Sequence, residues 1–224
     1  FTPPPIAGTV DLYSYDQNIL FAHGLNYRPR PVLQSYSAYT PELAAMNAAH
    51  LRSAAAATDI LFAIQPVDGR FPALDDAPSW PELLSRYDVA EAGGKFLHLK
   101  RAAVPRPFAF VPLENLAGRL DENVHVPDAT NGLVWVELEI HQTLAGRVLS
   151  ALYKPPPLSL IITMQNGGQK HFRLVPGMAR GGFLLSPVVA DNDAFAALAT
   201  GGWRHKLAGQ TVESITVSPA GRPW

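Results

Sequence analysis

The chain has 224 residues, of which 47% are hydrophobic and 17% charged, so it contains enough apolar material for a packed core. Eighteen basic and nineteen acidic residues give a net charge of -1, which lacks the basic excess that binding to nucleic-acid phosphates requires. Cysteine is absent, which excludes disulfides and thiolate metal sites within this chain.

No apolar run reaches the roughly 18 residues that a membrane-spanning helix needs. The longest apolar stretches are interrupted by Asp59, and by Asp191 and Asp193. The chain begins at Phe1 without Met and without a signal-peptide pattern, so we expect a segment of a larger or processed protein. The 21 prolines form short clusters that are expected between strands or at their ends.

The first half alternates strand and helix patterns. Residues 9–15 alternate apolar and polar side chains, which is typical of a strand with one buried face. Residues 31–36 predict a second extended segment. Thr40, Pro41 and Glu42 then provide a capping oxygen, a proline at the first helical position and an acid near the positive helix end, so a helix is predicted from Pro41 to Arg52.

Three further elements complete this half. The continuous apolar run over residues 58–64 predicts a strand that is buried on both faces. Ser79 begins a short helix whose inward stripe is Leu83, Leu84 and Tyr87, and residues 95–101 alternate as another strand. Right-handed crossovers between these elements would make the last strands parallel, giving a small α/β domain over residues 1–105.

The second half has only strand patterns and one short helix. Residues 132–143 alternate as a long strand with one dry and one wet face, and the Asn166-Gly167 turn predicts a β-hairpin between residues 158 and 176. Residues 182–189 and 211–219 predict two more strands, with a short helix over 191–200 between them. We therefore expect an α+β chain in which residues 106–224 form an antiparallel β-sandwich of jelly-roll type.

Residues 28–43, RPRPVLQSYSAYTPEL, concentrate arginine, hydroxyl and proline residues. The arginines at positions 28 and 30 would clamp an anionic sugar or a lipid phosphate, or would instead tie loops together through Asp11, Asp16 or Asp68. The candidate ligand-binding residues of this region and the following helix are Arg28, Arg30, Gln34, Tyr36, Tyr39, Asn47 and His50.

The two tyrosines, with Gln34 and Ser35, would offer stacking faces and hydrogen bonds to a sugar ring, or would fill the junction between sheet and helix. Asn47 and His50 lie on or beside the helix stripe that faces the sheet, and there they need hydrogen-bond partners. As an acid-base pair they lack a recognisable nucleophile, so no catalytic residue is predicted.

Carboxylate and histidine patterns indicate no metal or cofactor. Asp75 and Asp76 suggest either a metal or glycosidase site or, as we prefer, a solvated turn before the second helix. Asp191 and Asp193 alternate as in a calcium loop but lack its glycine and terminal glutamate, so we expect them to favour the helix start. The seven histidines show no zinc-binding spacing, and neither a nucleophile elbow nor a phosphate loop occurs.

Four phrases over roughly residues 9–101 carry a family resemblance: GTVDLYSYDQNILFAHGLNY, RPRPVLQSYSAYTPEL, RFPALDD and SWPELLSRY. Together they resemble the extracytoplasmic region that follows the membrane spans in a group of uncharacterised bacterial polytopic proteins, some labelled glycosyltransferase-like. The resemblance implies a periplasmic or outward-facing domain at the bacterial inner membrane, whose partner is the membrane-embedded remainder of its parent protein. It implies no catalytic residues.

These observations predict a non-catalytic envelope domain that supports or binds a glycan or a lipid-linked sugar. A carbohydrate-active enzyme is the first alternative, with acid-base groups among Asp68, Asp75, Asp76 and His50. A protein–protein interaction module is the second, marked by an exposed apolar patch around Trp203, Trp224 or a sheet edge.

Overall fold

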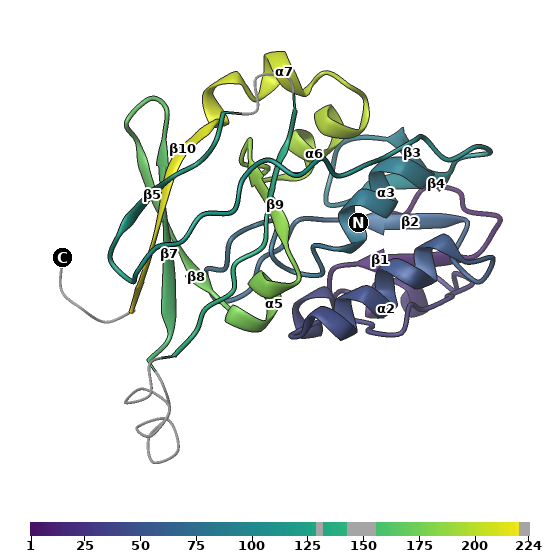
Figure 1. Cartoon of the computed structure of the whole chain (residues 1–224). Coiled ribbons are helices and arrows are strands. Elements are labelled where there is room, and N and C mark those ends of the chain that lie inside the picture. The colour runs from purple at the N-terminus through teal and green to yellow at the C-terminus, as the bar shows by residue number, and fades with distance from the viewer. Residues whose placement is uncertain (129–131, 143–155, 220–224) are drawn as a thin grey trace.

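The computed structural model describes residues 1–128, 132–142 and 156–219, and it shows a mixed α+β fold (Figure 1). A four-stranded mixed sheet comes from the first half of the chain, and a four-stranded antiparallel sheet and a two-stranded sheet come from the second half. The predicted α+β composition is confirmed, whereas a jelly-roll sandwich is not. Within the described ranges, no helix combines the length and the apolar composition that crossing a membrane requires.

The first sheet has the strand order β1 (Val10–Tyr13), β2 (Asp59–Phe62), β4 (Leu97–Arg101) and β3 (Tyr87–Glu91). The first two strands are parallel, but the other pairs are antiparallel. The prediction of parallel last strands was wrong because an unpredicted strand, β3, follows the second helix directly and pairs with β4 as a hairpin.

The helices of this half are α1 (Asn18–Ala22), the 3-10 turn η1 (Ser35–Ser37), α2 (Pro41–Arg52) and α3 (Ser79–Arg86). The predicted bounds of α2 are confirmed, and the Thr40 hydroxyl accepts a hydrogen bond from the Leu43 backbone amide at 3.3 Å. Residues 31–36 do not form the predicted extended strand, because the chain bends there and enters η1.

Strand β1 is buried at every residue, so the prediction of a wet face for Asp11 and Tyr13 was also wrong. These two side chains point toward Arg30, which covers the Tyr13 ring and pairs with the Asp11 carboxylate. Both faces of β1 are therefore buried. Val10 and Leu12 lie on an apolar face, whereas Asp11 and Tyr13 lie on a face that contacts Arg30.

The second half contains the antiparallel sheet β5 (Asn123–His125), β10 (Val212–Pro219), β7 (Leu158–Met164) and β8 (Gln169–Leu174). The predicted hairpin is confirmed as β7 and β8, with Gly167 at a φ of 81° in its turn. The predicted long strand over residues 132–143 is reduced to β6 (Val134–Val136), which pairs with β9 (Phe183–Ser186).

The remaining helices are α5 (Pro176–Arg180), α6 (Asn192–Ala199), α7 (Trp203–Lys206) and the 3-10 turn η2 (Ala208–Gln210). The Asp191 carboxylate caps α6 by accepting from the Ala194 backbone amide at 2.8 Å, which confirms its predicted role at the helix start. In Figure 1, β9 lies between the two larger sheets.

One large apolar core contains residues from both halves of the chain. The Phe62 ring of β2 lies 4.2 Å from the Phe195 ring of α6, and the Trp80 ring of α3 lies 5.1 Å from the same phenylalanine. The predicted boundary near residue 105 separates the two larger sheets along the sequence, but the two sets of residues share this core.

Candidate ligand-binding cavity

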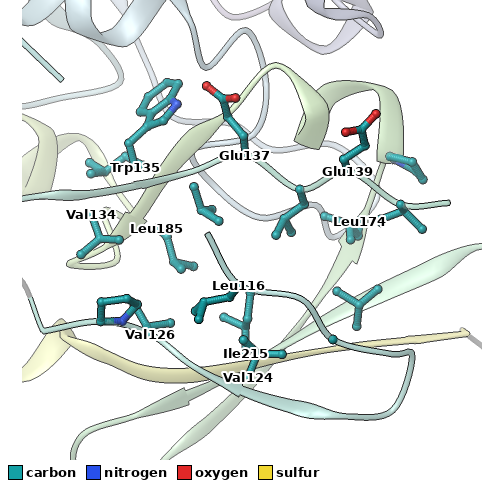
Figure 2. Close-up of a pocket in the computed structure, with 18 of the residues that line it drawn as sticks. Leu116, Val124, Val126, Val134, Trp135, Glu137, Glu139, Leu174, Leu185 and Ile215 are labelled. Carbon is teal, nitrogen blue, oxygen red and sulfur yellow. The ribbon is translucent and has the colours of Figure 1, made fainter. Parts of the chain in front are cut away.

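A half-open cavity of about 3080 Å³ lies beside the β5-β10-β7-β8 sheet (Figure 2). Its walls are this sheet, residues 108–126 and residues 132–142. The interior side chains are mainly aliphatic and include Leu116, Val124, Val126, Val134, Leu174, Leu185 and Ile215. The sequence analysis placed no site here, because aliphatic residues with strand periodicity indicate an ordinary core.

One wall of the cavity is a non-regular segment, residues 107–118, which we call the strap. Within the described residues, no hydrogen bond involves the strap. It is fixed at its ends, where the Arg106 guanidinium donates to the Leu84 and Tyr87 carbonyls and the Asp121 amide donates to the Val217 carbonyl at 2.9 Å. Its large apolar residues are at least 46% exposed: Phe108, Phe110, Val111, Leu113 and Leu116.

The opposite wall keeps the predicted alternation beyond the short strand β6. Val136, Leu138 and Ile140 pack against the core, as does Val134, whereas Glu137 and Glu139 are exposed. Figure 2 shows the two carboxylates on the side of this wall that faces away from Leu116. The predicted dry face is therefore present, and the predicted wet face is present at Glu137 and Glu139 but not at Trp135, which also packs against the core. Most of the segment is not a hydrogen-bonded strand.

Aromatic rings connect the two walls at the edge of the cavity. The Phe108 and Phe110 rings lie 5.1 Å apart in an edge-to-face arrangement, and the Phe110 ring lies 5.3 Å from the Trp135 ring. We call this set the aromatic ladder. The Trp135 indole packs directly against Gly182, because a Cβ at position 182 would overlap the Trp135 Nε1 atom.

The candidate residue Arg30 lies outside this cavity and is completely buried. Its Nη1 donates to Asp11 Oδ2 at 3.1 Å and to the Leu12 carbonyl at 2.7 Å, and its Nη2 donates to Ser35 Oγ at 3.0 Å. The guanidinium carbon lies 3.6 Å from the centre of the Tyr13 ring. Of the two predicted roles, the contacts match the structural tie to Asp11.

Asn47 and Asp76 extend this buried network. The Asn47 side chain accepts from the Val32 amide at 2.8 Å, donates to the Val32 carbonyl at 3.1 Å and donates to Asp76 Oδ2 at 2.8 Å. The same Asp76 oxygen lies 3.6 Å from Arg30 Nε. Asn47 thus fixes the bend after the arginine against α2, and the predicted solvated turn at Asp76 was wrong.

Burial raises the pKa of the Asp76 carboxyl from 3.8 to about 7, although Arg30 and Asn47 act in the opposite direction. Burial also raises the pKa of Asp11, again against the effect of Arg30. The folded protein therefore keeps protons that the unfolded chain has already released between about pH 4 and pH 7.

Because the folded state binds more protons in this range, we expect stability to decrease as the pH rises from 5 to 8. The expected decrease is on the order of 2 kcal/mol, measured as the free energy of urea unfolding at each pH. Asp76→Asn mimics the protonated carboxyl and should remove most of the decrease, whereas Asp193→Asn on an exposed carboxylate should leave it in place. A pH-independent wild-type stability would contradict the expectation.

Tyr36 and Tyr39 are organised by a second buried arginine, Arg70, that the sequence analysis did not select. Arg70 Nη1 donates to the Tyr36 carbonyl and to Asp75 Oδ1, both at 2.9 Å, and its Nη2 donates to the Tyr39 hydroxyl at 3.1 Å. Nη1 also lies 3.7 Å from Met178 Sδ of α5, so Arg70 joins the two halves. The sequence RFPALDD contains both Arg70 and its ion-pair partner Asp75. The five-residue spacing between them was the sequence signal that could have predicted this ion pair.

The other candidate residues do not converge on one point. Arg28 is exposed, His50 is half-buried on α2, and Gln34 accepts a hydrogen bond from the Tyr36 hydroxyl at 2.5 Å. Burial lowers the pKa of His50. Trp203 is partly exposed at the start of α7, and Trp224 lies outside the described residues.

The carboxylates of the enzyme alternative contact three different arginines. Asp75 pairs with Arg70 at 2.9 Å, and Asp76 lies beside Arg30. Asp68 pairs with Arg173 at 2.8 Å on the surface. Within residues 1–128, 132–142 and 156–219, no three histidine or acidic side chains are placed to share a metal ion.

A buried histidine–aspartate pair was also not selected from the sequence. His98 Nε2 of β4 lies 2.7 Å from Asp59 Oδ1 of β2, and Asp59 Oδ2 accepts from the Thr58 hydroxyl at 2.8 Å. The pair lies in the interior of a sheet that the strand patterns predicted, so cross-strand pairing explains it without a reaction.

Comparison of the sequence with protein-family models, with curated proteins and with solved structures found no match.

Proposed function

We propose that this chain is a non-catalytic binding domain for a lipid-linked sugar at the surface of a bacterial envelope membrane. The observation that carries the proposal is the large cleft with an aliphatic lining and with the aromatic ladder on two of its walls. The described lining of the cavity is rich in aliphatic and aromatic side chains, and this composition supports a binding role.

The size and lining of the interior suit a hydrocarbon chain. Its volume of about 3080 Å³ exceeds the range of roughly 300 to 1,000 Å³ that small-molecule sites occupy. An aliphatic cavity offers little hydrogen bonding to water, so a long apolar chain would gain free energy by transferring its surface there. Each buried methylene contributes about 0.8 kcal/mol.

The edge of the cavity suits a sugar. Ring faces such as those of Phe110 and Trp135 stack on the apolar faces of pyranose rings. A carboxylate on the outer side of the same wall would accept hydrogen bonds from a hydroxyl group only where the sugar extends beyond the cleft. Glu137 follows the indole by two residues and lies on the same side of the wall (Figure 2). This combination replaces Tyr36 and Tyr39 as the preferred sugar platform.

The envelope location in this proposal comes from the resemblance over residues 9–101. In the same proposal, the second half is a jelly-roll-like module, and the antiparallel pairing in both of its sheets supports that interpretation. The membrane-embedded remainder of the parent protein would be the partner that holds this module close to its lipid ligand.

We expect Leu116→Asp to weaken binding of dodecyl maltoside by at least about tenfold, because a carboxylate in the aliphatic interior must lose its water when the chain enters. Isothermal titration with monomeric detergent measures the affinity. Leu116 is 48% exposed, so the fold should tolerate the change.

Leu33→Asp is the matched control, since Leu33 is 47% exposed and is not part of the cavity. It should change the affinity less than twofold. Equal effects of the two variants, or no binding by the wild-type protein, would refute the proposal.

A protein-binding surface is the second candidate, because the exposed strap residues form an apolar patch. In that case the strap would contact the rest of the parent protein. Loss of association with the parent in Leu116→Asp, together with no detergent binding by the wild-type protein, would favour this candidate over the first.

A further inference from the structure

Asp76 joins three parts of the first half at one point in the interior. Its Oδ2 accepts a hydrogen bond from Asn47 Nδ2 of α2 at 2.8 Å and lies 3.6 Å from Nε of the buried Arg30. Asp76 itself belongs to the turn of residues 75–78, and its backbone carbonyl accepts from the amide of Ser79, the first residue of α3, at 3.0 Å. The residue therefore connects the start of α3 to α2 and to the bend after Arg30.

The surroundings of this carboxyl favour its neutral form. In the part of the chain that the structure describes, Asp76 Oδ1 and Arg30 Nε are buried and have no hydrogen-bond partner. Arg30 is the cation that acts on Asp76, Asp11 and Tyr13 of β1 also act on it, and the groups from α2 and α3 are neutral hydrogen-bonding side chains. An ionised Asp76 would place two carboxylates beside one guanidinium, and a buried carboxylate needs several donors.

Opening of the turn would return an ionised Asp76 to water. The residue has a φ of 53°, which is a sparsely populated backbone conformation for a residue with a side chain. Burial raises the pKa of its carboxyl from 3.8 to about 7, and hydration in an opened turn would restore the ordinary value. Opening therefore releases a proton, so it becomes easier as the pH rises from about 4 towards 7.

We propose that the turn of residues 75–78 is a pH-sensitive latch, which holds the start of α3 while Asp76 is protonated and opens as Asp76 ionises. Trp80, Pro81 and Leu84 of α3 line the cavity, so an open latch would loosen one of its walls. For the cavity, this inference rests on the proposed function and adds its regulation: the ligand is held more tightly at pH 5 than at pH 8.

Amide hydrogen exchange followed by NMR on the whole chain tests the latch without any ligand. The protection factors of the Ser79 and Trp80 amides, each relative to an unfolded peptide at the same pH, should fall at least about tenfold between pH 5 and pH 8. At pH 8 they should also lie at least about tenfold below those of the central strand β2. Equal protection of both sets at pH 8 would mean that the turn opens only with the whole fold, which would refute the latch.

Asp76→Asn is the matched variant, because its amide keeps the shape of the protonated carboxyl and asparagine also tolerates a φ of 53°. It should remove most of the fall in protection at Ser79 and Trp80. Asp193→Asn removes an exposed carboxylate instead and should keep the wild-type pH dependence. The same fall in Asp76→Asn as in the wild-type protein would show that another group controls the turn, contrary to the proposal.

Isothermal titration with monomeric dodecyl maltoside, which has no titrating group, tests the effect on the cavity. The wild-type affinity should be at least about threefold higher at pH 5 than at pH 8, whereas the affinity of Asp76→Asn should differ less than twofold. Equal wild-type affinities at the two pH values would overturn the regulation of the cavity. If the detergent binds at neither pH, the proposed function fails, and the exchange rates still decide whether the latch exists.

Discussion

Arg30→Met is expected to destabilise the protein by about 4 kcal/mol, measured as the free energy of urea unfolding at pH 7. The substitution leaves the Asp11 carboxylate in the interior without its ion-pair partner, and Asp76 also loses its nearest positive charge. It additionally removes the donors to the Leu12 carbonyl and to Ser35. Unpaired buried charge and lost hydrogen bonds both act in the same direction.

Arg28→Met is the control, because Arg28 is exposed and lies two residues away on the same segment. It should change stability by less than about 0.5 kcal/mol. A loss below 1 kcal/mol for Arg30→Met would mean that the buried network contributes little, and the structural interpretation of residues 28–43 would then be wrong.

Gly182→Ala is expected to cost about 3 kcal/mol. Gly182 has a φ of 81°, a backbone conformation that disfavours a side chain by about 1 to 2 kcal/mol. The new methyl group would also overlap the Trp135 indole and lie 3.0 Å from Glu137 Cγ, so the second wall of the cavity must move. Thermal and urea unfolding measure the loss, and detergent binding should weaken as well.

Gly201→Ala separates the two contributions. Gly201 has a φ of 83°, but a Cβ there would meet no atom within 4 Å. The control should therefore lose only the backbone contribution of about 1 kcal/mol and keep its detergent affinity. If both variants lose the same stability, contact with Trp135 does not explain the need for glycine at position 182.

Local signals predicted those elements that local chemistry determines. Thr40 and Pro41 located the start of α2, and Asn166 with Gly167 located the hairpin turn. The strand direction of β4 could not be predicted in this way, because it depends on whether the intervening chain forms β3. The pairing of β3 with β4 is a contact between two strands, which local sequence signals do not encode. The burial pattern of β3 is also irregular, so its sequence lacks the alternation that predicts a strand.

The candidate site was harder to predict for a related reason. The sequence indicated Asp11 as one of three partners for Arg30, but Asp76 joins the same network from 46 positions away along the chain. The cavity walls come mostly from residues between 108 and 219, with Trp80, Pro81 and Leu84 added from α3, and each wall separately has the composition of a core. Only the three-dimensional arrangement shows that these aliphatic faces line one half-open cavity.

The strap has a consequence for self-association. A segment whose backbone amides make no hydrogen bonds and whose aromatic residues are exposed can pair, as an additional β-strand, with a strand of a neighbouring molecule. Pro105, Pro107 and Pro112 lack the amide hydrogen that such intermolecular pairing needs, so they interrupt the run of available donors. We therefore expect these prolines to disfavour fibrous aggregation through the exposed apolar surface of the strap.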